Sequence, residues 1–258
     1  MTRISLATFF ICISFIYAQP SGQSIILKMD QRLKPVDIEM DFKMTLRSSS
    51  KKNNRKSHFR LMKQMEKRYQ DGKFKSKLLL RFIEPKEVKG SSLLNWDWVG
   101  KKNDDQWLYI PKLRKVKRIR PSDKSRNFQG SEFTYGDFME RDLDLDSYEL
   151  ITQDYFSGNE CYVVKATPND KSSYQPRIFW IDKTHYLIRK IEFFNSDNEK
   201  VKILEKLDYV KNNQYWTPTK KIMKNLLNGN STEMEVLKVS YDQGLKDNIF
   251  TEKYLKRF

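Results

Sequence analysis

The sequence has 258 residues, of which 38% are hydrophobic and 32% are charged, and its formal net charge is +16. This length allows one large domain or two small ones. Only two cysteines occur, Cys12 and Cys161, which excludes a scaffold held by several disulfides. The positive charge is compatible with nucleic acid, phospholipid headgroups or lipopolysaccharide as partners, and equally with an ordinary, highly soluble surface.

Residues 1–18 have the pattern of a secretory signal peptide. Arg3 supplies the positive start, residues 4–17 are apolar, and Ala18 is a small residue suited to cleavage. The apolar stretch is shorter than the roughly 20 residues of a membrane span, although an uncleaved anchor is the alternative. We predict a mature protein of residues 19–258, a single soluble domain with net charge +15, since Arg3 is the only charge removed. Export argues against nucleic acid as a partner.

The mature chain begins with a short helical pattern and then changes to a strand pattern. Apolar residues within 24–33 fall on one helical face, and Ser24 is the expected cap. A two-residue period follows, and it places Met40, Phe42 and Met44 on one face and charged residues on the other. This alternation predicts a half-buried antiparallel strand with one wet face.

Further strands are predicted between turn-like segments such as "DGK", "NSDNEK" and "LNGNS". They cover residues 58–68, 74–82, 92–98, 106–110, 161–167, 177–181, 187–194, 201–210, 217–225 and 232–241. The acidic segment 142–153 is predicted to be an edge strand. About ten strands with few helices predict a mainly β (α+β) fold, built on one curved antiparallel sheet or barrel.

The sequence lacks the residue patterns of known catalytic and metal sites. The only histidines, His58 and His185, have no cluster of ligand-type residues beside them in the sequence, and one cysteine cannot build a zinc site. Aspartates within 142–153 have the spacing of a calcium loop, but Ser147 stands where that loop needs glycine. We therefore predict no enzyme activity, no metal and no cofactor.

Aromatic and methionine side chains are the more informative residues. Trp96 and Trp98 are two positions apart and therefore share one face of a strand, and Trp180 lies in another strand. Methionines and aromatics fill cores, but they also line adaptable lipid pockets. Core packing is the default for any one of them, whereas a sheet this large with few helices favours an interior space. The predicted cavity lining is Met40, Phe42, Met44, Trp96, Trp98 and Trp180.

Six blocks between Lys77 and Leu255 resemble, in the same order, the outer-membrane lipoprotein-sorting proteins of the LolA-like family. The blocks are "FIEPKEVKGSSLL", "DDQWLYIPKLRKVKRI", "NFQGSEFTYGDF", "FWIDKTHYLIRKIEFF", "YWTP" and "NIFTEKYL". One departure is Gln129, which stands where the family usually has methionine before Gly-Ser.

The resemblance implies a LolA/LolB-like open half-barrel of antiparallel strands, closed by helices around an apolar cavity that holds acyl chains. It implies a periplasmic carrier that transfers lipoproteins or lipids towards an outer-membrane acceptor, with an RND-type inner-membrane exporter as an expected partner. It supplies no catalytic residues. We expect the carrier to be a monomer. The alternatives are a ligand-free accessory interaction protein of an envelope export complex and, on charge alone, a secreted polyanion-binding protein.

Within this frame, residues 109–138 are interpreted as part of the cavity rim. Apolar Val116 and Ile119 alternate with basic residues, as in a strand with one wet face that could meet an anionic headgroup or an exporter. These basic residues are Lys115, Lys117, Arg118 and Arg120. A long ordered loop follows, and its predicted anchors are Phe128, Gly130, Phe133 and Tyr135.

Overall fold

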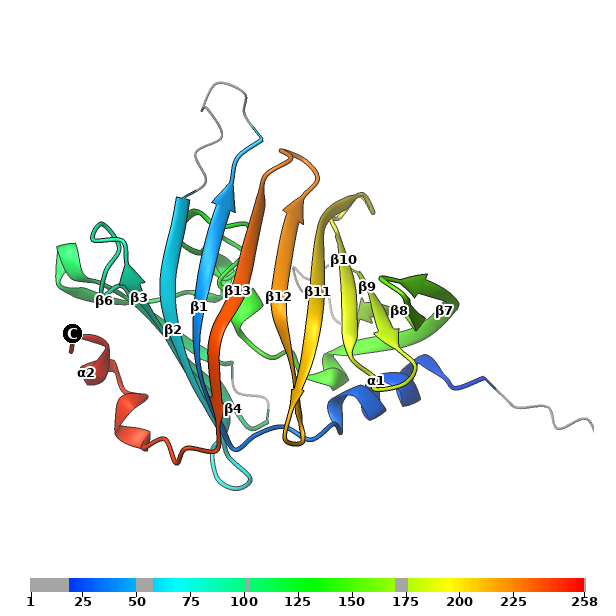
Figure 1. Ribbon diagram of the computed structural model, residues 1–258, viewed down its shortest axis with the longest axis horizontal. Coiled ribbons are helices and arrows are strands. Elements are labelled where there is room, and N and C mark those ends of the chain that lie inside the picture. Colours follow the sequence, from blue (N-terminus) through cyan, green and yellow to red (C-terminus); the bar gives the residue numbers. More distant parts are fainter. Residues whose placement is uncertain (1–18, 50–57, 101–102, 170–175, 258) are drawn as a thin grey trace, which may run out of the picture.

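The computed structural model describes residues 19–49, 58–100, 103–169 and 176–257. They form one antiparallel sheet of 13 strands in the order β6-β5-β4-β3-β2-β1-β13-β12-β11-β10-β9-β8-β7. The sheet is strongly curved but not closed, because β6 and β7 remain as separate edges (Figure 1). The predicted signal peptide, residues 1–18, lies outside the described residues. No helix among the residues described has the length and hydropathy that a membrane span requires.

The strands alternate with short turns along the chain, as their sequence pattern predicts. The first half of the sheet consists of β1 (Asp37–Arg47), β2 (His58–Arg68), β3 (Phe74–Glu84), β4 (Ser92–Trp98), β5 (Asp105–Ile110) and β6 (Lys115–Arg118). The second half consists of β7 (Asp146–Phe156), β8 (Asn159–Pro168), β9 (Arg177–Asp182), β10 (Ile188–Phe194), β11 (Lys200–Asn212), β12 (Tyr215–Asn225) and β13 (Ser231–Tyr241).

The mainly β prediction is confirmed, but the sheet has 13 strands rather than about ten. The bounds predicted for β2 and β4 agree with the structure, and the other strands differ by a few residues. The acidic edge strand β7 begins only at Asp146, because residues 143–145 form a 3₁₀ turn. The two edge strands are the hardest to count from the sequence, since they are largely exposed and carry little apolar alternation.

The described residues contain two α-helices, α1 (Gly22–Asp30) and α2 (Glu252–Leu255). Helix α1 starts two residues earlier than predicted, because the Ser21 side chain, not that of Ser24, accepts the capping hydrogen bond. Helix α1 packs at the β7 end of the sheet, and Gly22 allows this because an added Cβ would lie 2.7 Å from the backbone of Glu149. In the part of the chain that the structure describes, 3₁₀ turns occur at Pro111–Leu113, Pro121–Asp123, Phe128–Gly130, Gly136–Phe138, Leu143–Leu145 and Asp247–Ile249.

The two faces of the sheet have different coverings. The main hydrophobic core lies on the concave face, where alternate residues such as Phe42, Leu80 and Met223 meet α1 and the long loop between β6 and β7. A second cluster on the opposite, convex face packs Leu79 and Leu94 against Phe250 and Leu255 of the C-terminal segment. The concave face is thus covered mainly by a loop, where the sequence predicted closure by helices.

Candidate functional site

A small apolar hollow lies on the concave face between β1, β2, β12 and β13. It contains about 220 Å³ of empty space, including open solvent, and its lining residues are Met40, Phe42, Gln64, Lys221, Met234 and Val236. Cross-strand pairing explains why these residues converge, because Phe42 lies opposite Val236 on one side and Met62 on the other. Two of the six predicted lining residues, Met40 and Phe42, therefore border the hollow.

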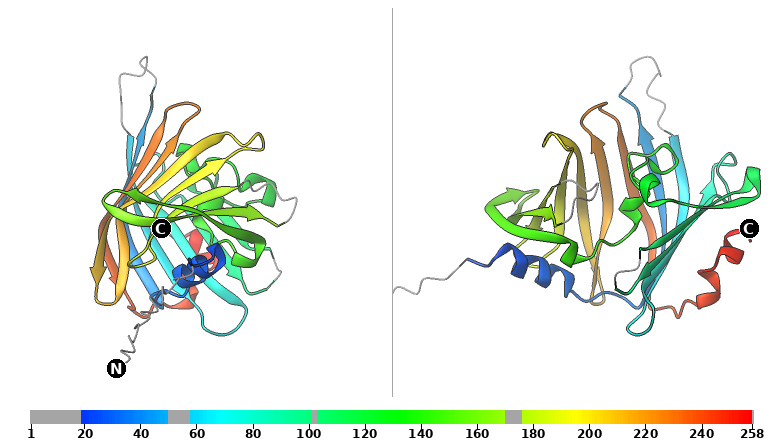
Figure 2. Two further views of the ribbon diagram at one scale, coloured as in Figure 1. Left: turned by 90° about the vertical axis from the view of Figure 1, so that its right-hand side faces the viewer. Right: turned by 180° about the vertical axis from the view of Figure 1, so that it is seen from behind.

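Met44 shares the face of Met40 and Phe42 but lies deeper in the core. Its side chain is fully buried in the main cluster, beneath the loop that crosses this part of the sheet. Seen from behind, this loop lies in front of the strands that carry the hollow (Figure 2). The loop therefore determines how much of the concave face an incoming ligand could reach.

Aromatic side chains attach the loop to the sheet. Phe128 is 0% exposed and packs against Phe82 of β3, with ring centroids 5.6 Å apart, and it makes an edge contact with Phe138 at 4.8 Å. Phe133 is buried in the same cluster, and half-buried Tyr135 packs edge-on against Phe128 at 5.5 Å. All three aromatic residues predicted as anchors therefore contact the core.

The loop backbone is also held by polar side chains of the sheet. Arg60 donates to the carbonyl oxygen of Gln129 at 2.6 Å, and Asn95 donates to that of Phe138 at 2.6 Å. At Gln129 it is the backbone oxygen, not the side chain, that makes the contact. Gly130 follows with φ +76°, a left-handed conformation that suits glycine. Gly130 thus provides a backbone turn, and its role as an anchor stays a prediction.

Glu132 connects the loop to the second half of the sheet. Its N–H donates to the Thr232 hydroxyl at 2.9 Å, its carbonyl oxygen accepts from Lys202 at 2.7 Å, and its carboxylate accepts from Asn225 at 2.7 Å. These three contacts come from three neighbouring strands, β13, β11 and β12. These hydrogen bonds therefore hold the loop against β11, β12 and β13.

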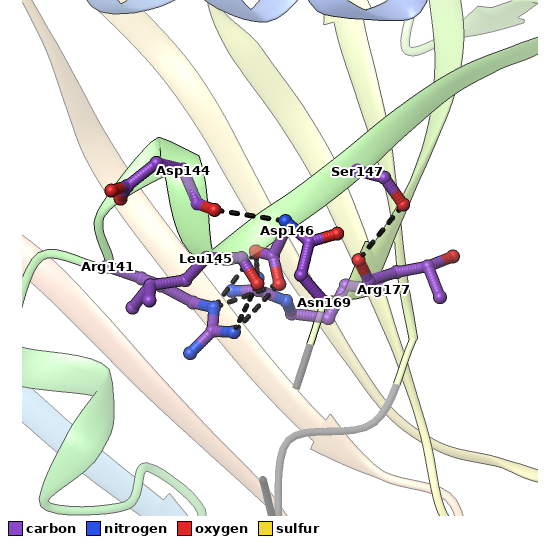
Figure 3. Close-up of polar contacts among 8 residues, drawn as sticks. Arg141, Asp144, Leu145, Asp146, Ser147, Asn169 and Arg177 are labelled. Atoms are coloured by element: carbon purple, nitrogen blue, oxygen red, sulfur yellow. Dashed lines mark hydrogen bonds and ion pairs between the residues drawn. The ribbon is translucent and has the colours of Figure 1, made fainter. Parts of the chain in front are cut away.

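A buried carboxylate fixes the end of the loop where β7 begins. The Asp146 side chain is 0% exposed and lies between two guanidinium groups (Figure 3). Arg141 donates to both of its oxygens at 2.8–3.1 Å, and Arg177 of β9 pairs with Oδ2. Two cations around one carboxylate compensate its loss of hydration. The arrangement is structural, since both oxygens of the Asp146 carboxylate are engaged by the two arginines.

Charged residues of β2, β11, β12 and the loop also lie on the concave face, where the sequence analysis expected apolar side chains. Arg68 pairs with Glu66 at 2.7 Å and with Glu140 of the loop at 2.5 Å. Two lysines, Lys206 and Lys221, face each other across β11 and β12. Burial lowers the pKa of Lys206 to about 7, and the charge of Lys221 contributes to the same shift. Only the long-range strand register brings these groups together, so no local sequence signal could have found them.

The three tryptophans predicted to line a cavity lie on the other face of the sheet. Trp96 packs against Trp98 and Phe74, and its indole N–H donates to the carbonyl oxygen of Phe250 in the C-terminal segment. Trp180 belongs to a separate convex cluster with Cys161. The structure therefore does not bring these tryptophans together with Met40. For Trp96 the reason is that the C-terminal segment covers this part of the convex face and leaves the indole half-buried.

The predicted basic rim residues lie on and directly after the edge strand β6. Lys115, Lys117 and Arg120 are exposed, whereas exposed Arg118 pairs with Asp105 of β5. Pro121 begins a 3₁₀ turn just after them. This places a positively charged edge beside the loop that covers the concave face.

The remaining titratable candidates show no arrangement for catalysis. His185 is exposed and packs its ring against Trp216, with centroids 4.6 Å apart. Burial raises the pKa of the Cys161 thiol to about 11, so it is not activated as a nucleophile. Within the described part of the chain, no group of three or more His, Cys, Asp or Glu side chains could hold a metal ion.

The open curved sheet, with its apolar concave face covered by a long loop, defines a class of half-barrel proteins. A candidate outer membrane lipoprotein-sorting protein domain from Vibrio parahaemolyticus has this fold, with a TM-score of 0.84 and 30% identity over 92% of this chain and 98% of its own. A DUF1329 family protein from Desulfovibrio piger is similar, with a TM-score of 0.84 and 26% identity over 91% and 97% of the two chains.

A LolA superfamily protein from Nitrosomonas europaea shares the fold, with a TM-score of 0.70 and 18% identity over 92% of this chain and 100% of its own. Residues 75–257 match the model of a family described as an uncharacterized protein. No curated protein matches the chain. The chain belongs to the outer membrane lipoprotein-sorting family.

Proposed function

We propose that the protein is a periplasmic carrier that binds acyl chains of lipids or lipoproteins on its concave face and passes them towards the outer membrane. The observation that carries this proposal is the apolar hollow beside Met40 and Phe42 on the concave face of a family-typical half-barrel. The predicted signal peptide supports a periplasmic location, and an RND-type exporter is the proposed donor.

Burial of the acyl chain supplies the binding energy. Removing methylene groups from water is worth about 0.8 kcal/mol each, so ten of them contribute on the order of 8 kcal/mol before ordering costs. Transfer needs no nucleotide hydrolysis by the carrier if the acceptor binds the lipid more tightly. Methionine side chains such as Met40 and Met234 can adapt to chains of different shape.

Binding a long acyl chain requires the loop to move. The empty space of about 220 Å³ includes open solvent, so the enclosed part of the hollow is far smaller than ligand pockets, which usually measure about 300–1,000 Å³. Phe128 and Phe133 occupy the adjacent part of the concave face, and displacing them would extend the apolar surface along Phe82 and Met62. The loop is therefore proposed to cover the site in the absence of lipid.

The second candidate is a ligand-free accessory protein of an envelope export complex. The buried loop favours it, because Phe128 already fills the space that a ligand would need. A pull-down that recovers an exporter but no lipid would support this function.

Lipid extraction decides between the two candidates. Protein purified from its own cell envelope should release an acyl lipid into organic solvent, detected by mass spectrometry, and should bind a fluorescent acyl probe. Met40→Trp should fill the hollow and reduce probe uptake, while its melting temperature stays close to wild type. Trp96→Phe on the convex face is the control and should leave uptake unchanged. Repeated absence of lipid together with no probe binding would contradict the carrier function.

A further inference from the structure

Two lysines lie side by side on the concave face next to the hollow. Lys206 of β11 is the direct cross-strand partner of Lys221 of β12, and Lys221 lines the hollow. Directly opposed residues in an antiparallel pair have Cβ atoms about 4.5–5.5 Å apart, and like charges there destabilise a sheet. The two positive charges therefore repel each other at the border of the hollow.

The acidic side chains nearby are already engaged elsewhere. Glu66 accepts from Gln64 at 3.3 Å and pairs with Arg68 at 2.7 Å, and Glu140 pairs with the same arginine at 2.5 Å. Across the described ranges, neither lysine of the opposed pair makes an ion pair or a side-chain hydrogen bond with another residue. Buried or half-buried charges are usually paired, so the two ammonium groups lack the partner that such positions normally have.

A third positive charge increases the repulsion. Burial is the largest cause of the lowered Lys206 pKa of about 7; the charges of Lys221 and Arg32 lower it further, and only Glu140 acts in the opposite direction. Burial likewise lowers the pKa of Lys221, against the attraction of Glu66. An anion between the two lysines would relieve this repulsion. Perturbed groups of this kind are typical of functional sites.

Lysines on the convex face of the same strand behave differently. Lys220 lies 3.4 Å from Glu233, and Lys224 lies 2.6 Å from Glu205. Each therefore has an acidic partner on a neighbouring strand. The contrast indicates that unpaired lysines are a property of the concave face and not of strand β12 as a whole.

We propose that Lys206 and Lys221 bind the anionic group of an amphiphile whose acyl chain lies in the hollow beside Met40 and Phe42. The inference rests on the proposed carrier function and narrows its ligand class to lipids that carry a carboxylate or a phosphate. The lysines orient the ligand, since the charged end meets β11 and β12 while the chain extends towards the loop.

Calorimetry with matched amphiphiles tests this site. The mature chain is titrated at pH 6, below the Lys206 pKa of about 7, with palmitate, palmitoyl lysophosphatidylglycerol and uncharged 1-palmitoylglycerol, all below micelle formation. We expect at least tenfold tighter binding of one or both anionic ligands than of the neutral one. The double variant Lys206→Met/Lys221→Met should lose this preference while retaining the neutral ligand.

The control removes the same amount of charge from the other face. Lys220→Met/Lys224→Met should keep the full preference for anionic ligands. Preference for palmitate would identify a carboxylate, and preference for the lysophospholipid a phosphodiester; either supports the site. Equal affinity for all three ligands, or an unchanged preference in the Lys206→Met/Lys221→Met variant, would overturn the anion site alone. Failure of all three to bind would overturn the carrier function as well.

Discussion

Phe128 of the long loop packs against Phe82 of β3, with ring centroids 5.6 Å apart and planes inclined by 24°. This contact joins the loop to β3, in the first half of the sheet, and makes both parts of one hydrophobic core. Arg60 adds a polar contact beside it, since its guanidinium lies over the Phe82 ring at 5.5 Å and donates to the loop backbone. The covering of the concave face and the stability of the fold are therefore coupled.

Truncating Phe128 should destabilise the protein and expose the concave face. Phe128→Ala is expected to lower the free energy of unfolding by about 3–5 kcal/mol, the usual cost for a buried phenylalanine. It should also increase the uptake of an acyl probe at temperatures where the variant remains folded. Chemical denaturation and probe fluorescence measure the two effects.

The exposed Leu113 provides the control for this truncation. Its side chain is 60% exposed, so Leu113→Ala should change the free energy of unfolding by no more than about 0.5 kcal/mol. A Phe128→Ala protein as stable as wild type would contradict the shared core. A destabilised protein with unchanged probe uptake would instead show that the loop does not restrict the site.

Removing the charge of Asp146 should be costly because two arginines depend on it. Asp146→Asn is expected to lower the free energy of unfolding by about 3–5 kcal/mol, the range found when one partner of a buried ion pair is removed. The loss leaves Arg141 and Arg177 without their shared carboxylate. Asp144→Asn, on the exposed 3₁₀ turn nearby, should have little effect in the same urea titration. Comparable stability of the two variants would contradict the role assigned to Asp146.

The strands of the sheet could be predicted from the sequence because residues close together in the chain determine each strand and each turn. Alternation of apolar and charged residues between 36 and 46 predicted β1, and turn residues separated the strands that follow. Phe128 and Phe133 were proposed as loop anchors because they are large apolar residues in an otherwise polar segment, and both are buried. Local pattern does not determine what covers each face of the sheet.

The parts of the site that escaped prediction depend on long-range register. The sequence gives no sign that Trp96 is buried by Phe250, which lies 154 residues further along the chain. For an isolated strand, the sequence does not determine which side chains face the concave side of the sheet until the pairing with its neighbours is known. Lys206 and Lys221 look like ordinary solvent-facing residues until the register of β11 and β12 places them opposite each other.

Asp97 should make stability depend on pH. Burial raises its pKa to about 7, against the opposing hydrogen bond from Ser76 at 2.5 Å, while the carboxylates of Asp104 and Glu140 add to the increase. An unfolded aspartate titrates near about 3.9, so between pH 4 and 7 the folded state holds more protons. The contribution of Asp97 therefore becomes less favourable as pH rises through this window, and its cost is complete above pH 7.

Asp97→Asn removes this cost because the amide is neutral. We expect the variant to gain about 1–3 kcal/mol in free energy of unfolding at pH 8, with little change at pH 4. Urea titrations at both pH values measure the difference, and Asp71→Asn in the exposed turn after β2 is the control. An equal effect at pH 4 and pH 8 would show that ionisation of Asp97 is not responsible.

The exposed cations of the rim should attract anionic membranes. Lys115, Lys117 and Arg120 make no ion pair with any residue in the described ranges, whereas Arg118 is paired with Asp105. A basic residue near an anionic bilayer contributes about 1 kcal/mol. A variant in which these three residues are changed to glutamate and Arg118 is kept should therefore bind phosphatidylglycerol vesicles more weakly, by about a hundredfold or more. Sedimentation with vesicles measures the affinity.

A control variant at three lysines near the C-terminus distinguishes binding through the rim from a general effect of net charge. Lys246, Lys253 and Lys256 are exposed and lie on the segment that covers the convex face. Their change to glutamate alters the net charge equally, so a general charge effect would reduce vesicle binding to the same extent. Binding through the rim predicts a much smaller loss, and wild-type binding that weakens steeply with salt because exposed charges are screened. Equal losses in the two triple variants would leave the rim without a specific role.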